Sequence, residues 1–162
     1  MVSSQSSAIP HESQFAHPSS LTGRLLLRSM NIAHARLHRW GLKAAGIQPS
    51  DKVLDVGCGG GKALARILAQ TRREVAGIDH SPEAVETSRR VNRAAVASGR
   101  LRVLEGSVDE LPFRDGFFDV VTAFETTYFW PDLQAGLFEI RRVLGHRSEE
   151  HTSELQSRVS IS

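Results

Sequence analysis

The chain has 162 residues, of which 40% are hydrophobic and 23% charged, and its formal net charge is +2. This size and composition predict one folded domain with a packed core and argue against a wholly disordered chain. The basic residues are scattered, so the charge indicates neither a nucleic-acid nor a membrane partner. No apolar run approaches the roughly 20 residues of a membrane-spanning helix.

Three further features of the sequence concern the compartment of the protein and its metal content. The single cysteine, Cys58, excludes an internal disulfide bond, as expected in a reducing compartment. The amino terminus lacks the charged-then-apolar order of a signal peptide, so we expect a cytoplasmic protein. No spacing of His, Cys and acidic residues indicates a metal site.

The first 46 residues divide into a polar tail and one expected helix. Residues 1–20 are rich in Ser, Gln, His and Pro and show no apolar period, which predicts a disordered tail. Residues 21–46 carry apolar side chains at helical spacing, so we expect an N-terminal helical lid that ends near Gly46. Its apolar stripe consists of Leu26, Met30, Ala33, Leu37, Trp40 and Ala44.

In residues 47–145, short apolar runs alternate with helical patterns. We expect strands at 52–56, 74–78, 101–104 and 118–124, and helices at 63–70, 82–99 and 133–144. Ser81 is the expected N-cap of the second helix and Pro82 its first residue. The alternation predicts an α/β fold with a Rossmann-like, doubly wound, mainly parallel sheet of about four strands. Strand 118–124 would be its open edge.

The segment after residue 145 breaks this pattern. Residues 147–157 have almost no apolar content and match, codon by codon, one reading frame of a common short-read sequencing adapter. A chance match of this length would be rare. We therefore interpret residues 146–162 as a non-native tail derived from an adapter.

The most informative stretch is 53–61, which reads Val-Leu-Asp-Val-Gly-Cys-Gly-Gly-Gly. A strand that runs into closely spaced glycines and then a helix lets the backbone approach a ligand closely. A Walker A loop would need a glycine at Val56 and a hydroxyl at Ala63, so two of its positions disagree.

A dinucleotide-binding turn and a turn for S-adenosylmethionine remain. Gly57 and Gly59 fit the dinucleotide fingerprint, but Lys62 stands where its third glycine should be. Asp55 would also repel a pyrophosphate, whereas it is compatible with the ammonium group of S-adenosylmethionine, which has no phosphate. The turn therefore favours S-adenosylmethionine. An NAD(P)-dependent Rossmann oxidoreductase and an inactive cofactor-binding fragment stay open as alternatives.

A carboxylate supports the nucleoside interpretation. Asp79 ends the second expected strand and lies 20 residues after Gly59. A carboxylate at this place can accept hydrogen bonds from both ribose hydroxyls, as in dinucleotide-binding folds. The other interpretation is a favourable negative charge at a helix start beside Ser81.

Together these motifs resemble the class I S-adenosylmethionine-dependent methyltransferases, in particular their type 11/25-like domain, over residues 47–144. The segments that carry the resemblance are 55–61, 78–81, 106–113 and 118–121. The resemblance implies S-adenosylmethionine as cofactor and methyl transfer to a small-molecule acceptor. Sheets of this class have seven strands, so it also implies a C-terminally truncated methyltransferase with little or no activity of its own.

The resemblance also implies a set of cofactor-binding residues. Gly57, Cys58 and Gly59 would contact the cofactor through the backbone. Asp79 would hold the ribose, and His80 would flank the adenine. The full set is Asp55, Gly57, Cys58, Gly59, Gly61, Asp79, His80, Ser107, Val108 and Phe124. In this set, Ser107 replaces an acid that the family often carries and accepts less strongly from the adenine amino group, whereas Val108 would use its backbone.

The acceptor side is less defined by the sequence. The expected residues are Asn31, His34, Glu125, Tyr128 and Trp130. For Tyr128 and Trp130, packing against the last helix is an equal alternative, and for His34 a surface or capping role is the favoured one. No general base can be named from the sequence.

Overall fold

The computed structural model describes residues 38–145 and 158–161. The sheet has five parallel strands in the order β3-β2-β1-β4-β5, namely β1 (Val53–Val56), β2 (Val75–Asp79), β3 (Leu101–Glu105), β4 (Val120–Ala123) and β5 (Arg158–Ile161). The helices are α2 (Lys62–Leu68), α3 (Pro82–Val91), α4 (Arg93–Ala97), α5 (Leu133–Val143) and the short 3₁₀ helix η1 (Thr127–Phe129). The predicted Rossmann-like α/β fold is confirmed, and most elements begin and end within two residues of the predicted ones.

The number of strands differs from the prediction. We expected about four strands with β4 at an open edge, but β4 pairs with β5, which comes from the segment interpreted as a non-native tail derived from an adapter. The sequence Arg-Val-Ser-Ile in β5 alternates β-branched with polar side chains, a strand pattern that the adapter match of the neighbouring residues obscured. Residues 146–157 lie outside the described residues, as do residues 1–37 with the expected tail, most of the lid, Asn31 and His34.

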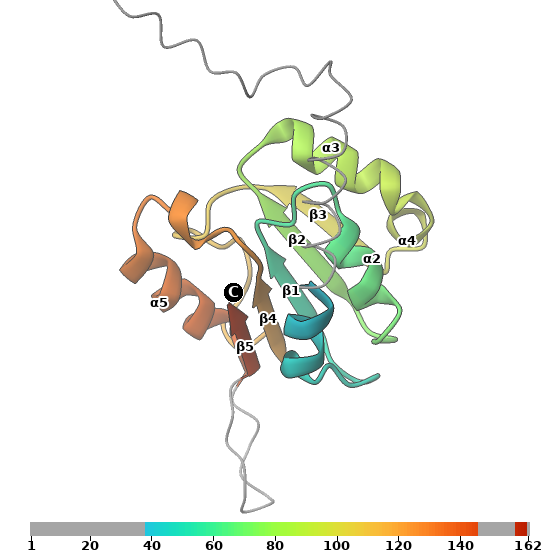
Figure 1. Cartoon of the computed structure of the whole chain (residues 1–162), viewed down its shortest axis with the longest axis horizontal. Helices are drawn as coiled ribbons and strands as arrows, with labels where there is room; N and C mark the ends of the chain where they lie inside the picture. Colours follow the sequence, from blue (N-terminus) through green and yellow to red (C-terminus); the bar gives the residue numbers. More distant parts are fainter. Residues whose placement is uncertain (1–37, 146–157, 162) are drawn as a thin grey trace, which may run out of the picture. The chain divides into compact units, whose positions relative to one another are not determined.

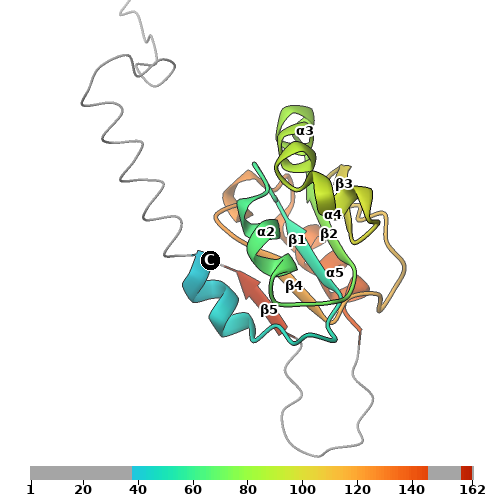
Figure 2. The ribbon, with the colours of Figure 1, turned by 90° about the vertical axis from the view of Figure 1, so that its right-hand side faces the viewer.

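The sheet has α5 on one face and α2 and α3 on the other (Figures 1 and 2), and an apolar cluster lies on each face. Along β1, Val53 packs on the side of α2 and α3, whereas Leu54 packs on the side of α5. In β4, Val120 and Val121 divide in the same way. All four side chains are completely buried, as expected for central strands of a sheet covered on both faces. The doubly wound arrangement thus follows from the strand sequences.

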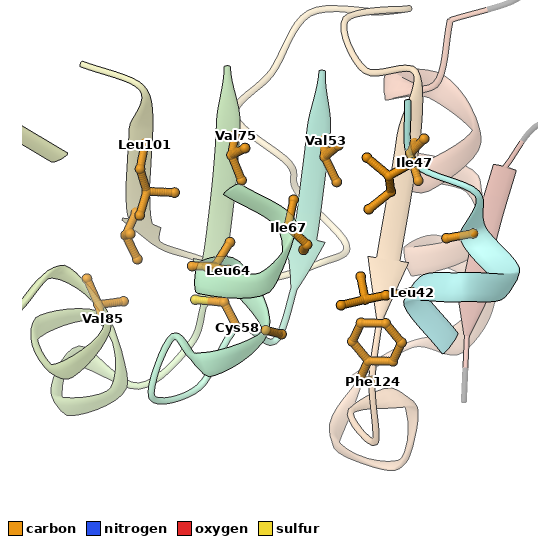
Figure 3. Packing of buried hydrophobic residues seen from close by; sticks show 14 residues of the cluster. Leu42, Ile47, Val53, Cys58, Leu64, Ile67, Val75, Val85, Leu101 and Phe124 are labelled. Atoms are coloured by element: carbon orange, nitrogen blue, oxygen red, sulfur yellow. The ribbon is translucent and has the colours of Figure 1, made fainter. Parts of the chain in front are cut away.

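Residues 38–45 form a helix, the described end of the predicted lid. It packs through Gly41, Leu42 and Ala45, and Leu42 faces Phe124 beside β4 (Figure 3). Trp40, placed in the apolar stripe by the sequence, is 65% exposed, so that part of the predicted stripe is wrong. The ring of Phe124 occupies the space where a side chain at Gly41 would lie. The helix therefore turns the face with Gly41 and Ala45 toward the sheet and leaves Trp40 exposed.

The helix predicted over 82–99 is interrupted. Ser81 caps α3 as expected, with its hydroxyl accepting a hydrogen bond from the backbone N–H of Ala84. At Asn92 the backbone leaves the helical conformation, and the Asn92 amide donates to the carbonyl oxygens of Gly61 and Ser88. The interruption therefore attaches α3 to the glycine-rich turn.

Arg142 in α5 fastens the loop that precedes β4. Its guanidinium donates to both carboxylate oxygens of Glu139 at 2.6 and 2.7 Å and to Asp115 at 2.7 Å. It also donates to the carbonyl oxygens of Phe113 at 2.7 Å and Leu111 at 2.9 Å. These bonds from Arg142 lower the pKa of the Glu139 carboxyl. Since one side chain satisfies five acceptors, this loop depends on it.

We expect Arg142→Met to lower the free energy of unfolding by about 2–3 kcal/mol, because it leaves a carboxylate and two carbonyl groups without their donor. The matched control is Arg141→Met, since Arg141 is exposed in the same turn of α5. Urea denaturation of both variants gives the comparison. Equal stability of the two variants would contradict the role given to Arg142.

Candidate cofactor site

The predicted site residues follow the carboxyl ends of adjacent strands. Val56 of β1 is in register with Ile78 of β2 and with Ala123 of β4. The segments after these three strands therefore begin at one edge of the sheet. In open α/β sheets, ligands bind outside this edge, where the strand order reverses.

The glycine-rich turn is hydrogen-bonded to β2. The backbone N–H groups of Gly57 and Cys58 both donate to the carbonyl oxygen of Ile78, at 2.8 and 3.1 Å. The N–H of Gly59 donates to the Asp79 carboxylate at 2.8 Å. Since these donors are satisfied within the protein, the turn presents few N–H groups to a phosphate.

The three glycines of this turn that have positive φ differ in what surrounds them. At Gly59, with φ of 49°, an added Cβ would meet no atom within 4 Å, so its backbone borders open space. At Gly57, an added Cβ would meet the side chain of Thr126. At Gly61 it would meet Ser88 and Asn92 at 2.5 and 2.6 Å. Gly61 thus serves helix packing here, and its cofactor contact stays a prediction.

Asp79 is placed for two tasks. It ends β2, is 8% exposed, and accepts from the backbone N–H groups of Gly59 at 2.8 Å and Ser81 at 3.0 Å. One carboxylate oxygen accepts from Ser81 at the start of α3, as the helix-start interpretation expects. The other oxygen accepts from Gly59 and so connects Asp79 to the glycine-rich turn. The neighbouring His80 has a largely exposed side chain, with its Nδ1 3.6 Å from Asp79 Oδ1.

Asp55 is buried beneath the turn. It is 2% exposed, and Thr122 of β4 donates a hydrogen bond of 2.6 Å to its carboxylate. Burial raises the pKa of Asp55 to about 7, the hydrogen bond from Thr122 lowers it, and the charge of Asp79 raises it. Near neutral pH this carboxyl group is therefore close to its titration midpoint.

Cys58 does not act as a nucleophile in this arrangement. Its side chain is buried, and burial together with the charges of Asp55 and Asp79 raises the pKa of the thiol to about 12. A thiolate, the reactive form, is thus disfavoured.

The loop after β3 carries Ser107 and Val108, whose contacts with the adenine stay a prediction. Ser107 is half-buried, and the Val108 side chain packs in the cluster beneath α5, next to Gly136. Because that side chain points into the core, a contact of Val108 with a ligand would use its backbone.

The segment after β4 separates the remaining predicted residues. Phe124 is buried against residues 38–45, with its ring centroid 5.1 Å from that of His38. Trp130 is half-buried and packs near Gly136, in line with the packing alternative. Tyr128, by contrast, is 69% exposed, and so is Phe129, which pairs with it at 4.7 Å between centroids.

Thr126 packs against the glycine-rich turn, a contact that the sequence did not predict. Its side chain lies over Gly57, and its hydroxyl is 3.5 Å from the carbonyl oxygen of Val56. The only signal is the absence of a side chain at Gly57, which is 69 positions away along the chain and pairs with Thr126 only in the fold.

The edge of the sheet at the carboxyl ends of the strands is acidic. Asp55 lies within β1, Asp79 ends β2 and Glu125 follows β4. Hydroxyl donors and a cationic group, both of which S-adenosylmethionine has, are compatible with this charge.

The strand order, the glycine-rich turn and the carboxylate after β2 define a Rossmann-like nucleoside-binding domain. The sequence profile of the family described as "Methyltransferase domain" matches residues 54–148. The chain therefore belongs to this family, the class I S-adenosylmethionine-dependent methyltransferases, rather than to the dinucleotide-dependent oxidoreductases.

Curated relatives agree with this assignment. The chain is 36% identical over 99 residues to Cycloartenol-C-24-methyltransferase 1 of Oryza sativa subsp. japonica, which covers 61% of the chain and 29% of the relative. It is 35% identical over 111 residues to the Ubiquinone/menaquinone biosynthesis C-methyltransferase UbiE of Geobacter sp. (strain M21). This match covers 67% of the chain and 47% of the relative. The chain thus spans less than half the length of these relatives.

Solved structures share the fold. The YcgJ protein from Bacillus subtilis has a TM-score of 0.64 and 26% identity, over 70% of this chain and 47% of that one. The geranyl diphosphate C-methyltransferase from Streptomyces coelicolor A3(2), solved with S-adenosyl-L-homocysteine, has a TM-score of 0.67. The match covers 82% of this chain and 51% of that one. At 19% identity, the second likeness concerns the fold alone.

Two kinds of feature are absent from the described part of the chain. Within residues 38–145 and 158–161, no helix is long and apolar enough to cross a membrane. The same residues contain no group of three His, Cys, Asp or Glu side chains that could hold a metal ion.

The raised pKa of Asp55 predicts a pH-dependent stability. Between about pH 4 and pH 7 the folded state holds a proton that the unfolded state has released, so this group makes stability fall as pH rises. Asp55→Asn, which keeps an oxygen for Thr122, removes this contribution. We expect the variant to gain stability over the wild type progressively up to about pH 7 and to keep a constant gain above it.

Urea denaturation of both proteins at half-unit pH steps measures this difference. Thr122→Val serves as the opposite control, because removing the hydrogen bond raises the pKa of Asp55 further and should extend the fall in stability to higher pH. Parallel curves for wild type and Asp55→Asn would contradict the assignment.

Proposed function

We propose that this chain is the cofactor-binding part of an enzyme that transfers a methyl group from S-adenosylmethionine to an apolar small molecule. The observation that carries the proposal is the turn after β1, whose N–H groups bond to Ile78 and Asp79 rather than facing a ligand. The turn therefore offers carbonyl and carboxylate oxygens, which suit the ammonium and ribose of this cofactor better than a phosphate.

The residues have distinct proposed roles. Asp79 would accept from the ribose hydroxyls, His80 would flank the adenine, and Ser107 with the Val108 backbone would meet its edge. The carbonyl groups of the turn, with Asp55 behind them, would hold the ammonium. The cofactor itself supplies the reactive methyl, so the protein mainly orients the donor and excludes water.

An apolar acceptor is proposed on two grounds. The names of the relatives include a sterol and quinones, which are largely hydrocarbon compounds. In this chain, Tyr128 and Phe129 present an exposed aromatic pair just after the carboxyl end of β4. Such a pair offers apolar contact area where the acceptor must approach.

An inactive cofactor-binding fragment is the second candidate, favoured by the partial span of the relatives. A non-native origin of residues 146–162 stays a proposal as well. Sequencing the gene across the codon for Leu144 tests it, since a native reading frame that differs after this point would support it and an unchanged frame would contradict it.

The cofactor is tested by thermal denaturation. We expect saturating S-adenosylhomocysteine to raise the melting temperature, because a ligand that binds only the folded state stabilises it. NADH at the same concentration should leave the melting temperature unchanged. A shift with NADH alone would overturn the proposed function.

Asp79→Ala tests the ribose contact. Since hydrogen bonds to charged groups contribute about 1.5–3 kcal/mol each, we expect the affinity for S-adenosylhomocysteine to fall at least tenfold. Ser81→Ala is the matched control, because it removes the cap of α3 and costs about 1 kcal/mol of stability without touching the ribose. Calorimetric titration separates the two. An equal affinity loss in both variants would reduce Asp79 to a helix-start charge.

A further inference from the structure

Thr126 lies over the glycine-rich turn. A Cβ added at Gly57 would overlap the Thr126 side chain, with the Thr126 methyl carbon nearest to it and the Thr126 Cβ 2.7 Å away. The Thr126 hydroxyl donates a hydrogen bond of 3.5 Å to the carbonyl oxygen of Val56. The half-buried Thr126 therefore fills the space above Gly57, and a side chain at position 57 would displace it.

The main chain of Thr126 begins the segment that carries the exposed aromatic pair. Its carbonyl oxygen accepts a hydrogen bond of 2.9 Å from the backbone N–H of Phe129. This bond closes η1, which Thr126 directly precedes. Tyr128 and Phe129, both 69% exposed, thus stand on a single turn that starts at Thr126.

The glycine-rich turn beneath Thr126 is held from its other side as well. The N–H of Gly57 donates to the carbonyl oxygen of Ile78 at 2.8 Å, which attaches Gly57 to the end of β2. A β-branched side chain such as that of threonine is restricted about its first torsion angle, so it acts as a stiff spacer. The position of η1 is therefore defined relative to the turn and to β2.

We propose that Thr126 is a positioning residue that sets the placement of the acceptor-side aromatic pair relative to the cofactor turn. The inference rests on the proposed function, in which the turn after β1 holds S-adenosylmethionine and the pair of Tyr128 and Phe129 contacts the acceptor. Transfer between two bound reactants depends steeply on their mutual placement. In this role Thr126 contacts neither reactant and acts through Gly57 on one side and η1 on the other.

Calorimetric titration of the full chain with S-adenosylhomocysteine tests the contact with the turn. Thr126→Val keeps the branched shape over Gly57 and loses only a long hydrogen bond, so we expect its affinity to stay within about twofold of the wild type. Thr126→Ala leaves a gap above Gly57, and we expect its affinity to fall about three- to tenfold, the scale of coupling between residues in contact. The matched control is Thr127→Ala, the same truncation one residue further along η1, which should leave the affinity unchanged.

Hydrogen exchange of the Phe129 amide, followed by NMR on the ligand-free chain, tests the contact with η1. This amide donates to Thr126, so its exchange reports directly on whether η1 is closed. We expect exchange to be several times faster in Thr126→Ala, because η1 has lost its support on Gly57, and unchanged in Thr126→Val. Thr126→Ser, which lacks only the methyl group over Gly57, should show both effects to a smaller extent and serves if the alanine variant does not fold.

A change in only one of the two measurements, or in neither, would overturn the joint role of Thr126. Equal results for valine and alanine at this position would overturn the packing contact as its basis. Failure of the wild type to bind S-adenosylhomocysteine would instead overturn the proposed function on which the inference rests.

Discussion

The hydrogen bonds between the turn after β1 and the end of β2 are the constraint on which the rest of the site depends. Gly57 and Cys58 share the carbonyl oxygen of Ile78, and Gly59 reaches the Asp79 carboxylate. These bonds extend the pairing of the two strands beyond the sheet. They thereby fix the glycine backbone and the Asp79 carboxylate relative to each other before any ligand binds, which reduces the ordering that binding would cost.

Packing from both sides maintains this junction. On one side Asn92, at the interruption between α3 and α4, donates to the carbonyl oxygen of Gly61. On the other, Thr126 covers Gly57. The glycines thus have different purposes, since Gly61 and Gly57 admit neighbouring side chains and Gly59 borders open space. The glycines of such a motif can therefore be required by packing as well as by ligand contact.

The sequence predicted the fold well because the strands and helices carry strong local signals. Buried strands such as Val53–Val56 and the Ser81-Pro82 helix start need no tertiary information. Two of the misses depend on the fold, whereas β5 has a local strand pattern that the adapter match obscured. The orientation of residues 38–45 follows from Phe124 lying on Gly41, and the interruption at Asn92 follows from its bonds to the turn. Phe124 and Gly61 lie far from these segments in the sequence, so local propensity could not predict either contact.

The position of the candidate site residues could be predicted from the sequence, but their electrostatics could not. Motif spacing predicted Asp55 and Asp79 at the carboxyl ends of adjacent strands, yet only the fold shows that Asp55 is buried and that the charge of Asp79 raises its pKa. Burial raises the pKa of Asp55 to about 7, so ionisation of this carboxyl group is less favourable in the folded protein than in the unfolded chain. A cationic group of a ligand near Asp55 would favour the ionised form, whereas a phosphate would disfavour it further. The burial of this one carboxyl group thus connects the stability of the free protein to the charge of the ligand that would bind beside it.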